Sequence, residues 1–130
     1  MALATAVGVR RFSKRRLKDI HQTKMLGIRS GREHRFTWVW VVVVKERVFI
    51  RSWNDKPTGW FRAFADEPLG TMKIANREVA IRTRKARGER LMKAIEAAYA
   101  EKYTTPASLV YVRGFKTTRR RKATVEITPR

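Results

Sequence analysis

The sequence has no cysteine, few acidic residues and no recognisable catalytic motif. The absence of cysteine excludes disulfide bonds and thiolate metal sites. The two histidines, His21 and His34, lack the spacing of a metal-binding pair, so we expect no metal site. No GxSxG or Walker segment occurs either. If the protein is an enzyme, its chemistry must therefore belong to a bound cofactor.

Long apolar segments are also missing. The run at 39–44 is much shorter than the ~20 apolar residues that span a bilayer. In the N-terminal MALATAVGVRRFSKRR, the charges follow the apolar residues, which is the reverse of a secretory signal, although a basic, acid-poor start also fits organellar targeting. We expect a cytoplasmic protein with no membrane partner. Residues 1–12 are predicted to form a loose terminal segment, and residues 13–130 a single domain.

Negative charge is scarce. Eleven acidic residues face 31 Lys and Arg residues, which gives a net charge of +20 and predicts an attraction to polyanions such as nucleic acid, anionic lipid or a phosphorylated small molecule. The basic residues are spread along the chain, with denser patches at 10–18, 82–90 and 119–122. Spread charge is weaker evidence for a binding site than one stripe, and a merely solvated surface is the alternative.

What the sequence does contain is β-branched and aromatic residues in short runs, which predict strands. Such strands mostly follow one another directly, which favours a mainly β, α+β fold with an antiparallel split β-barrel and a few flanking helices. The strands are expected at 25–29, 37–44, 47–53, 71–74, 78–82 and 123–128. Helices are expected from Ser13 to His21, after a Thr58 cap, and over Gly88–Tyr103, whereas 104–113 is ambiguous.

The stretch FTWVWVVVVKERVFIRSW, residues 36–53, predicts a hairpin that turns at Lys45-Glu46. A two-residue turn would pair Trp40 with Arg51 and Trp38 with Trp53, with an aromatic face that contains arginine and an opposite face that is purely aliphatic. Neither turn residue readily takes the positive φ that this turn needs. A longer loop or a bulge is the alternative, and a slip of one residue would exchange the two faces.

Two interpretations of the aromatic face remain open. Its tryptophans could fill a second core layer under the helix at 88–103, or they could form an interface or ligand surface, in which Trp and Arg are common. Arg51 favours the second interpretation, because burial of a guanidinium costs several kcal/mol unless an anion or a carboxylate pairs with it. The same face, with Trp38, Trp40 and Phe49, is the expected contact of a homodimer.

Four segments resemble an uncharacterised bacterial family, domain of unknown function 2255. They are RFTWVWVVVVKERVFIRSW, GWFRAF, IEAAYAEKY and ATVEITPR, and the resemblance covers about residues 26–130. Such proteins are grouped with flavin-binding split β-barrels, similar to pyridoxamine 5′-phosphate oxidases and deazaflavin-dependent nitroreductases. In addition, GIRSGREHRFT resembles the Gly-Arg-Lys-Ser-Gly segment of the nitroreductases and the strand that follows it, and ADEPLGTMKI resembles a later strand.

The resemblance implies a ligand site. Arg29, Ser30, Gly31 and Arg32 would form an anion-binding turn, and Lys56 and Trp60 would match a later loop and the start of its helix. With Trp38 and Trp40 as stacking surfaces and Arg51 as a charge, these residues would hold FMN or a deazaflavin between two subunits. The sequence departs from the nitroreductases at Trp38, Arg62 and the 57–60 loop, so a member of this fold without any cofactor is also compatible.

Two functional hypotheses follow. The first is a homodimeric split-barrel protein that binds FMN or another flat phosphorylated ligand, and that could be an oxidoreductase. The alternative is a non-enzymatic basic module for nucleic acid or another polyanion, because aromatic residues interleaved with arginine also suit single-stranded bases.

Overall fold

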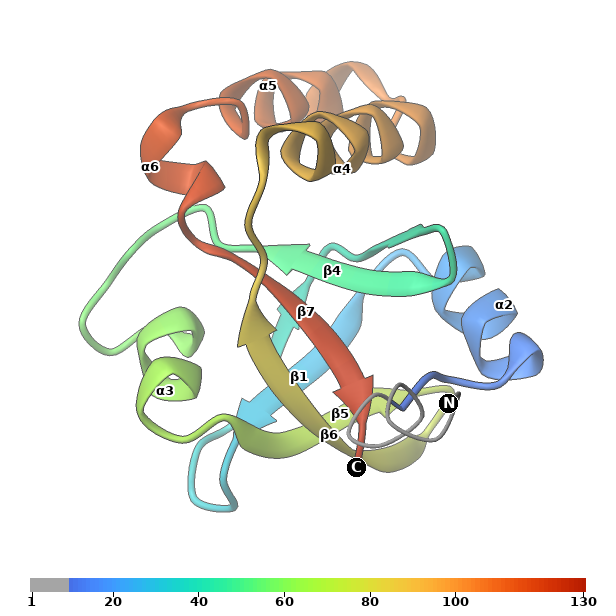
Figure 1. Ribbon diagram of the computed structural model, residues 1–130, viewed down its shortest axis with the longest axis vertical. Coiled ribbons are helices and arrows are strands. Elements are labelled where there is room, and N and C mark those ends of the chain that lie inside the picture. The colour runs from blue at the N-terminus through green and yellow to red at the C-terminus, as the bar shows by residue number, and fades with distance from the viewer. Residues whose placement is uncertain (1–9) are drawn as a thin grey trace, which may run out of the picture.

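The computed structural model describes residues 10–130, so most of the expected loose segment, residues 1–9, lies outside the described residues. The predicted α+β class is confirmed: seven antiparallel strands form one curled sheet, with a long helix over Glu89–Lys102 and shorter helices around it (Figure 1). The strands are β1 (Leu26–Ser30), β2 (Thr37–Val39), β3 (Val42–Val44), β4 (Arg47–Arg51), β5 (Leu69–Ile74), β6 (Arg77–Lys85) and β7 (Thr124–Pro129). The helices are α2 (Lys14–Gln22), α3 (Trp60–Asp66), α4 (Glu89–Lys102), α5 (Pro106–Gly114) and α6 (Thr118–Arg121).

The sheet curls because its two edge strands are neighbours in the sequence. The strand order is β2-β1-β5-β6-β7-β4-β3, so β2 and β3 lie at opposite ends of it. Only Trp40 and Val41 separate these two strands in the chain. The predicted single strand over 37–44 is therefore two strands, and the sheet must bend back on itself until its edges meet at this break.

At the break, the backbone of Val41 has no partner strand, and side chains at the end of α4 supply its hydrogen bonds instead. The Tyr103 hydroxyl accepts from the Val41 N–H at 3.0 Å and donates to the Lys24 carbonyl at 2.7 Å. The Lys102 ammonium donates to the Val41 carbonyl at 2.8 Å and to the Ile20 carbonyl at 3.2 Å. Because buried backbone groups need partners, these two side chains hold the junction in place.

The barrel interior is filled by aliphatic side chains from both halves of the sheet. Leu26, Ile28, Met72, Ile81 and Ile127 are fully or almost fully buried there. Helix α2 packs Leu17 and Ile20 against this core, and α3 adds Phe64. Ser13 caps α2, as predicted, with its side chain accepting from the Arg16 N–H. Phe12, from the segment predicted to be loose, is also buried in this cluster.

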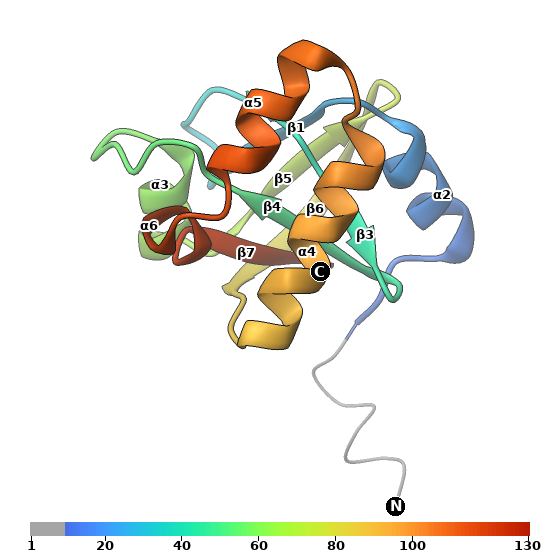
Figure 2. The same cartoon turned by 90° about the horizontal axis from the view of Figure 1, so that it is seen from above.

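A second core lies outside the barrel, between β3–β4 and the pair α4–α5, which lie together on one side of the sheet (Figure 2). Phe49 of β4 is fully buried there by α4 and α5, so it cannot take part in a homodimer contact. The Lys45-Glu46 hairpin has the predicted register, with Val42 opposite Phe49. However, Trp38 pairs with Gly27 of β1 and not with Trp53, because the chain changes partners at the break.

The helices differ from the prediction in three places. The ambiguous segment contains α5, which Thr105 caps. The short helix α6 was not predicted. Helix α3 begins after Gly59 without a side-chain cap, so the Thr58 cap is wrong. Within residues 10–130, every helix is too short or too polar to cross a membrane.

Candidate functional site

All four tryptophans of the chain line one open cleft, although they come from separate segments of the sequence. We call it the aromatic cleft. It has a volume of about 520 Å3 and lies between β2, the 52–59 loop, the start of α3 and one face of α5. Its aromatic lining is Trp38, Trp40, Trp53, Trp60, Tyr111 and Phe115, and its polar lining includes Asn54, Lys56 and Thr58.

Two of the tryptophans are fixed by their neighbours. Trp40 stacks on Tyr103 with ring centroids 4.1 Å apart and an angle of 6° between the planes. The Arg120 guanidinium lies 3.4 Å from the centre of the Trp53 ring and also donates to the Trp53 carbonyl. Such stacked and cation–π contacts hold the rings at defined angles, so this part of the cleft is already formed without a ligand.

Trp38 is different, because 52% of it is exposed. It stands opposite Gly27 in the β1–β2 ladder, and its ring lies over that residue: a Cβ at Gly27 would come within 3.2 Å of the indole. Glycine therefore lets the ring lie flat across β1 at the mouth of the cleft. Trp60, on the other wall, is half-buried and meets Phe61 and Phe64 edge-on.

Arg51 is buried inside the molecule. Its side chain has no exposed surface, and it donates to Glu96 at 2.9 Å, to the Phe115 carbonyl at 2.8 Å and to the Thr124 hydroxyl at 2.6 Å. This is the ion-paired core layer that the sequence left open as the structural alternative. The carboxylate that makes burial acceptable lies 45 residues away in the chain.

Glu96 is shared by two arginines. Besides Arg51, it accepts from both the Nε and Nη2 atoms of Arg121, at 2.6 and 2.7 Å. Burial alone would raise the pKa of Glu96, but the hydrogen bonds and charges of Arg121 and Arg51 outweigh it and lower that pKa. Glu96 therefore remains an anion, and the network ties β4, α4 and α6 together behind the cleft.

A smaller cavity of about 160 Å3 adjoins the aromatic cleft and shares Thr37, Thr58, Gly59 and Trp60 with it. Its lining includes Arg29, His34 and Arg35. The Arg29 guanidinium stacks on the Phe36 ring at 4.5 Å, and its buried Nε has no hydrogen-bond partner within residues 10–130. The cavity is thus a basic extension of a largely aromatic cleft.

The predicted anion-binding turn is used mostly for structure. The Ser30 hydroxyl lies 2.6 Å from the Glu67 carbonyl and 3.0 Å from the Ala63 carbonyl, and thus ties α3 to β1. The Gly31 N–H donates to the Leu69 carbonyl at 2.9 Å, so it continues the β1–β5 ladder. Arg32 is exposed and lines neither cavity. Of the four turn residues, only Arg29 brings a guanidinium to the basic extension, and its Nη2 already pairs with Glu78 at 3.5 Å.

The predicted site residues thus fall into three groups. Trp38, Trp40, Arg51, Lys56 and Trp60 line the aromatic cleft, although the Arg51 guanidinium points into its ion-pair network. Arg29 and Ser30 line the basic extension, and Gly31 and Arg32 line neither cavity. The sequence analysis missed Tyr111, Phe115 and Arg35. Tyr111 on α5 and Phe115 at its C-cap stand four residues apart, which is the spacing of one helical face, and this was the available signal.

Comparison with known proteins gives one family match and a similar solved structure. A family model described as "Uncharacterized protein conserved in bacteria (DUF2255)" matches residues 16–127. Among solved structures, the chain is similar to the crystal structure of the conserved hypothetical protein Rv2991 from Mycobacterium tuberculosis, with a TM-score of 0.55. The identity is 10%, and the match covers 89% of this chain and 78% of that one, so it supports the fold alone. No curated protein matches the sequence.

Proposed function

We propose, from the premise that this chain belongs to the bacterial family DUF2255, that the protein binds a flat phosphorylated ligand such as FMN in the aromatic cleft. The observation that carries the proposal is the meeting of all four tryptophans on one open cleft. Tryptophans that only fill a core are enclosed, whereas Trp38 keeps half of its surface exposed.

The dimensions and chemistry of the cleft support a ligand of this kind. Its volume of about 520 Å3 lies within the range of small-molecule sites, which are mostly apolar with a few polar groups. A fused flat ring has two apolar faces, and Trp38 offers it an open indole face. The rigid Trp40 and Trp53 rings would add contact area with little loss of side-chain entropy.

The phosphate would lie at the basic extension or beside Lys56. Arg35 lies there, as does Arg29, whose Nη2 pairs with Glu78 at 3.5 Å but whose Nε has no partner within residues 10–130. A guanidinium can donate two parallel hydrogen bonds to a phosphate. This differs from the arrangement that the sequence analysis inferred, because the Ser30 hydroxyl and the Gly31 N–H are engaged elsewhere. Lys56 is exposed on the 52–59 loop and could move to meet a negative group.

The residues of the cleft fit a flavin, whose bound ring would supply the redox chemistry of an oxidoreductase. The protein's own contribution would be to hold the ring between indoles, to exclude water with the walls of the cleft, and to neutralise the phosphate. A homodimer is part of the proposal, because a second copy over the open mouth would enclose Trp38.

Titration with FMN tests this function, with quenching of tryptophan fluorescence as the measurement. We expect saturable binding that Trp38→Ala weakens by about two- to tenfold, the worth of one aromatic contact. Lys56→Gln should also weaken it, whereas Lys18→Gln, an equal loss of charge on α2, should not. Equal effects of the two lysine changes would mean that only the diffuse charge attracts FMN, and the proposal would fail.

The nucleic-acid alternative rests on the same exposed indole and on the net charge of +20. It predicts that a short single-stranded DNA competes with FMN, and that its affinity falls steeply with salt. If the DNA binds to Trp38→Ala as tightly as to the parent protein, it is held by surface charge only. Native mass spectrometry of untreated protein separates the two hypotheses, because it reports the copurified ligand and the oligomer together.

A further inference from the structure

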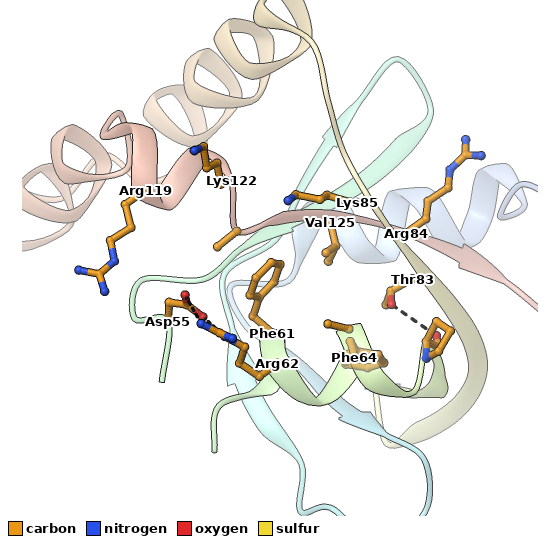
Figure 3. A pocket seen from close by; sticks show the side chains of 13 residues that line it. Asp55, Phe61, Arg62, Phe64, Thr83, Arg84, Lys85, Arg119, Lys122 and Val125 are labelled. Atoms are coloured by element: carbon orange, nitrogen blue, oxygen red, sulfur yellow. Dashed lines mark hydrogen bonds and ion pairs between the residues drawn. The ribbon is translucent and has the colours of Figure 1, made fainter. Parts of the chain in front are cut away.

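A second hollow, separate from the aromatic cleft, lies on the other side of the 54–56 segment. We call it the basic pocket (Figure 3). It has a volume of about 550 Å3 and lies between α3, β6 and the junction of α6 with β7. Asp55 lines this pocket, whereas its neighbours Asn54 and Lys56 line the aromatic cleft. The two sites thus share one wall but no lining residue.

The floor of the basic pocket is apolar. Phe64 and Val125 are buried beneath it, and the half-buried Phe61 ring stands near its centre (Figure 3). One edge of Phe61 packs against Trp60, which fixes the ring. Phe61 also packs against the barrel core, so part of the ring is left facing the pocket.

Five basic side chains surround this floor, and two of them are already paired. Arg62 makes a bidentate contact with Asp55, at 2.6 and 2.9 Å, and Arg84 pairs with Glu126 at 3.3 Å. In contrast, Lys85, Arg119 and Lys122 have no ion-pair partner within residues 10–130. Figure 3 shows Lys85 and Lys122 on one side of Phe61, opposite the Asp55–Arg62 pair.

The three unpaired cations come from different elements that the fold brings to one rim. Lys85 ends β6, whereas Arg119 and Lys122 belong to α6 and its end. All three side chains are exposed, so an anion with several charges can reach them and would be attracted to them. A bare phosphate would leave most of the volume and the Phe61 face without contact. The pocket therefore suits an anion that carries a flat apolar group.

From this arrangement, we propose that the basic pocket binds a small phosphorylated ligand of the nucleoside diphosphate class. Its phosphates would lie between Lys85 and Lys122, and its base would lie against Phe61, whereas the Arg119 guanidinium points away from the two lysines (Figure 3). The ion pair between Asp55 and Arg62 would close the opposite wall and offer polar edges to the base. This site is independent of the aromatic cleft, and the proposal does not require FMN to bind.

Isothermal titration calorimetry in about 150 mM salt tests the proposal, with ADP, pyrophosphate and adenosine as probes. ADP should bind more tightly than pyrophosphate, because only ADP reaches Phe61, and adenosine should bind weakly. The double variant Lys85→Gln/Lys122→Gln should lose about tenfold or more in ADP affinity, as expected when charge-assisted hydrogen bonds are removed. The matched control is Lys18→Gln/Lys24→Gln, which removes the same charge from exposed positions outside the pocket.

Two results would overturn the proposal. If the control pair weakens ADP as much as the pocket pair, the ligand is held only by the overall charge. A short single-stranded DNA could instead bind through Lys85 and Lys122 while ADP and pyrophosphate bind equally weakly. In that case these lysines contact the phosphate backbone of a nucleic acid and not a small ligand. FMN binding to the aromatic cleft should be unchanged in Lys85→Gln/Lys122→Gln, so the proposals for the two sites are tested separately.

Discussion

Arg51 was interpreted from the sequence as part of a ligand site, but in the structure it is a buried ion-pair partner of Glu96. A cation among aromatic residues indicates a ligand site when only its neighbours are known. The partners that satisfy it lie 45, 64 and 73 residues away, on α4, after α5 and on β7. No local sequence pattern predicts hydrogen bonds between residues so far apart in the chain. A buried ion pair also adds little net stability compared with an apolar pair, so it is better regarded as a device that fixes geometry.

Glu96 is expected to be more sensitive to substitution than Arg51. Glu96→Gln leaves the fully buried Arg51 guanidinium without a carboxylate, and breaking such a pair costs about 3–5 kcal/mol of unfolding free energy. Arg51→Met should cost less, because Glu96 keeps both hydrogen bonds from Arg121. Urea unfolding of each variant measures the difference.

The double variant Arg51→Met/Glu96→Gln provides the control for this prediction. It contains no uncompensated buried charge, so it should be more stable than Glu96→Gln alone. Arg51→Met should also bind FMN like the parent, because its guanidinium points into the ion-pair network. A loss of FMN affinity with unchanged stability would show instead that Arg51 contacts the ligand, as the sequence suggested.

At the level of elements, the hairpins were predictable and the break between β2 and β3 was not. Both two-residue turns contain non-glycine residues with positive φ: 50° and 65° at Lys45-Glu46, and 50° and 61° at Ala75-Asn76. The twist of the flanking strands requires this turn shape even where the residues disfavour it. Val39–Val44 looks continuous in sequence because nothing in a β-branched run indicates that its partner strand changes.

The Lys102–Tyr103 contact with the break should give the protein a characteristic dependence on alkaline pH. Burial lowers the pKa of Lys102 to about 8 from 10.5. Between these values the unfolded chain holds a proton that the folded protein has released, so stability should rise with pH. The neutral amine keeps two N–H groups for its two carbonyl partners.

Tyr103 has the opposite effect at higher pH. Burial raises its pKa to about 12 from 10, although its hydrogen bond with Val41 opposes the shift. Above pH 10 the unfolded chain loses a phenolic proton that the folded protein retains, so stability should fall. Urea unfolding at a series of pH values should therefore show a rise from pH 8 towards 10. The rise should vanish in Lys102→Met and persist in the exposed Lys93→Met. If the rise in stability between pH 8 and 10 persists in Lys102→Met, another titrating group causes it.

At the scale of the whole molecule, apolar exposure is concentrated while charge is spread. The large apolar side chains that stay exposed within residues 10–130 are Trp38, Val110 and Tyr111. Trp38 and Tyr111 stand at the aromatic cleft, and Val110 adjoins Tyr111 on α5. Exposed apolar surface gathered in one place commonly marks an interaction site. A second copy of the chain is the occupant we expect.

We therefore predict a homodimer that strengthens as salt increases. Each copy carries a net charge of +20, so the two copies repel one another, and salt screens that repulsion. Val110→Asp should shift the equilibrium towards monomer, whereas Ala80→Asp, at an exposed position on β6 away from this surface, serves as the control. Sedimentation equilibrium at low and high salt is the measurement. A parent that remains monomeric at both would contradict the prediction and leave the aromatic cleft open to solvent.

The site was predictable to the extent that its residues lie in one strongly patterned segment. Trp38 and Trp40 stood out in the hairpin, and the resemblance drew attention to Lys56 and Trp60. Tyr111 and Phe115 were missed because α5 has weak periodicity, and their role depends on how α5 packs on β4. The hydrogen bonds of the Ser30–Gly31 turn could not be predicted for a related reason: its partners, Leu69 and Glu67, come from a distant strand and helix end.

The position of β7 in the sheet has a consequence for how the protein is made. This strand comes last in the described chain, yet it lies between β6 and β4 and pairs with both. A nascent chain emerging from the ribosome can form the β5–β6 hairpin and the β3–β4 hairpin early, but no strand pairs β6 with β4 until residues 124–129 have been synthesised. Until then, two open strand edges are exposed to other chains. Closure of the barrel therefore waits for the end of translation of this segment, and a ribosome that stalls before it would release a protein with an aggregation-prone seam.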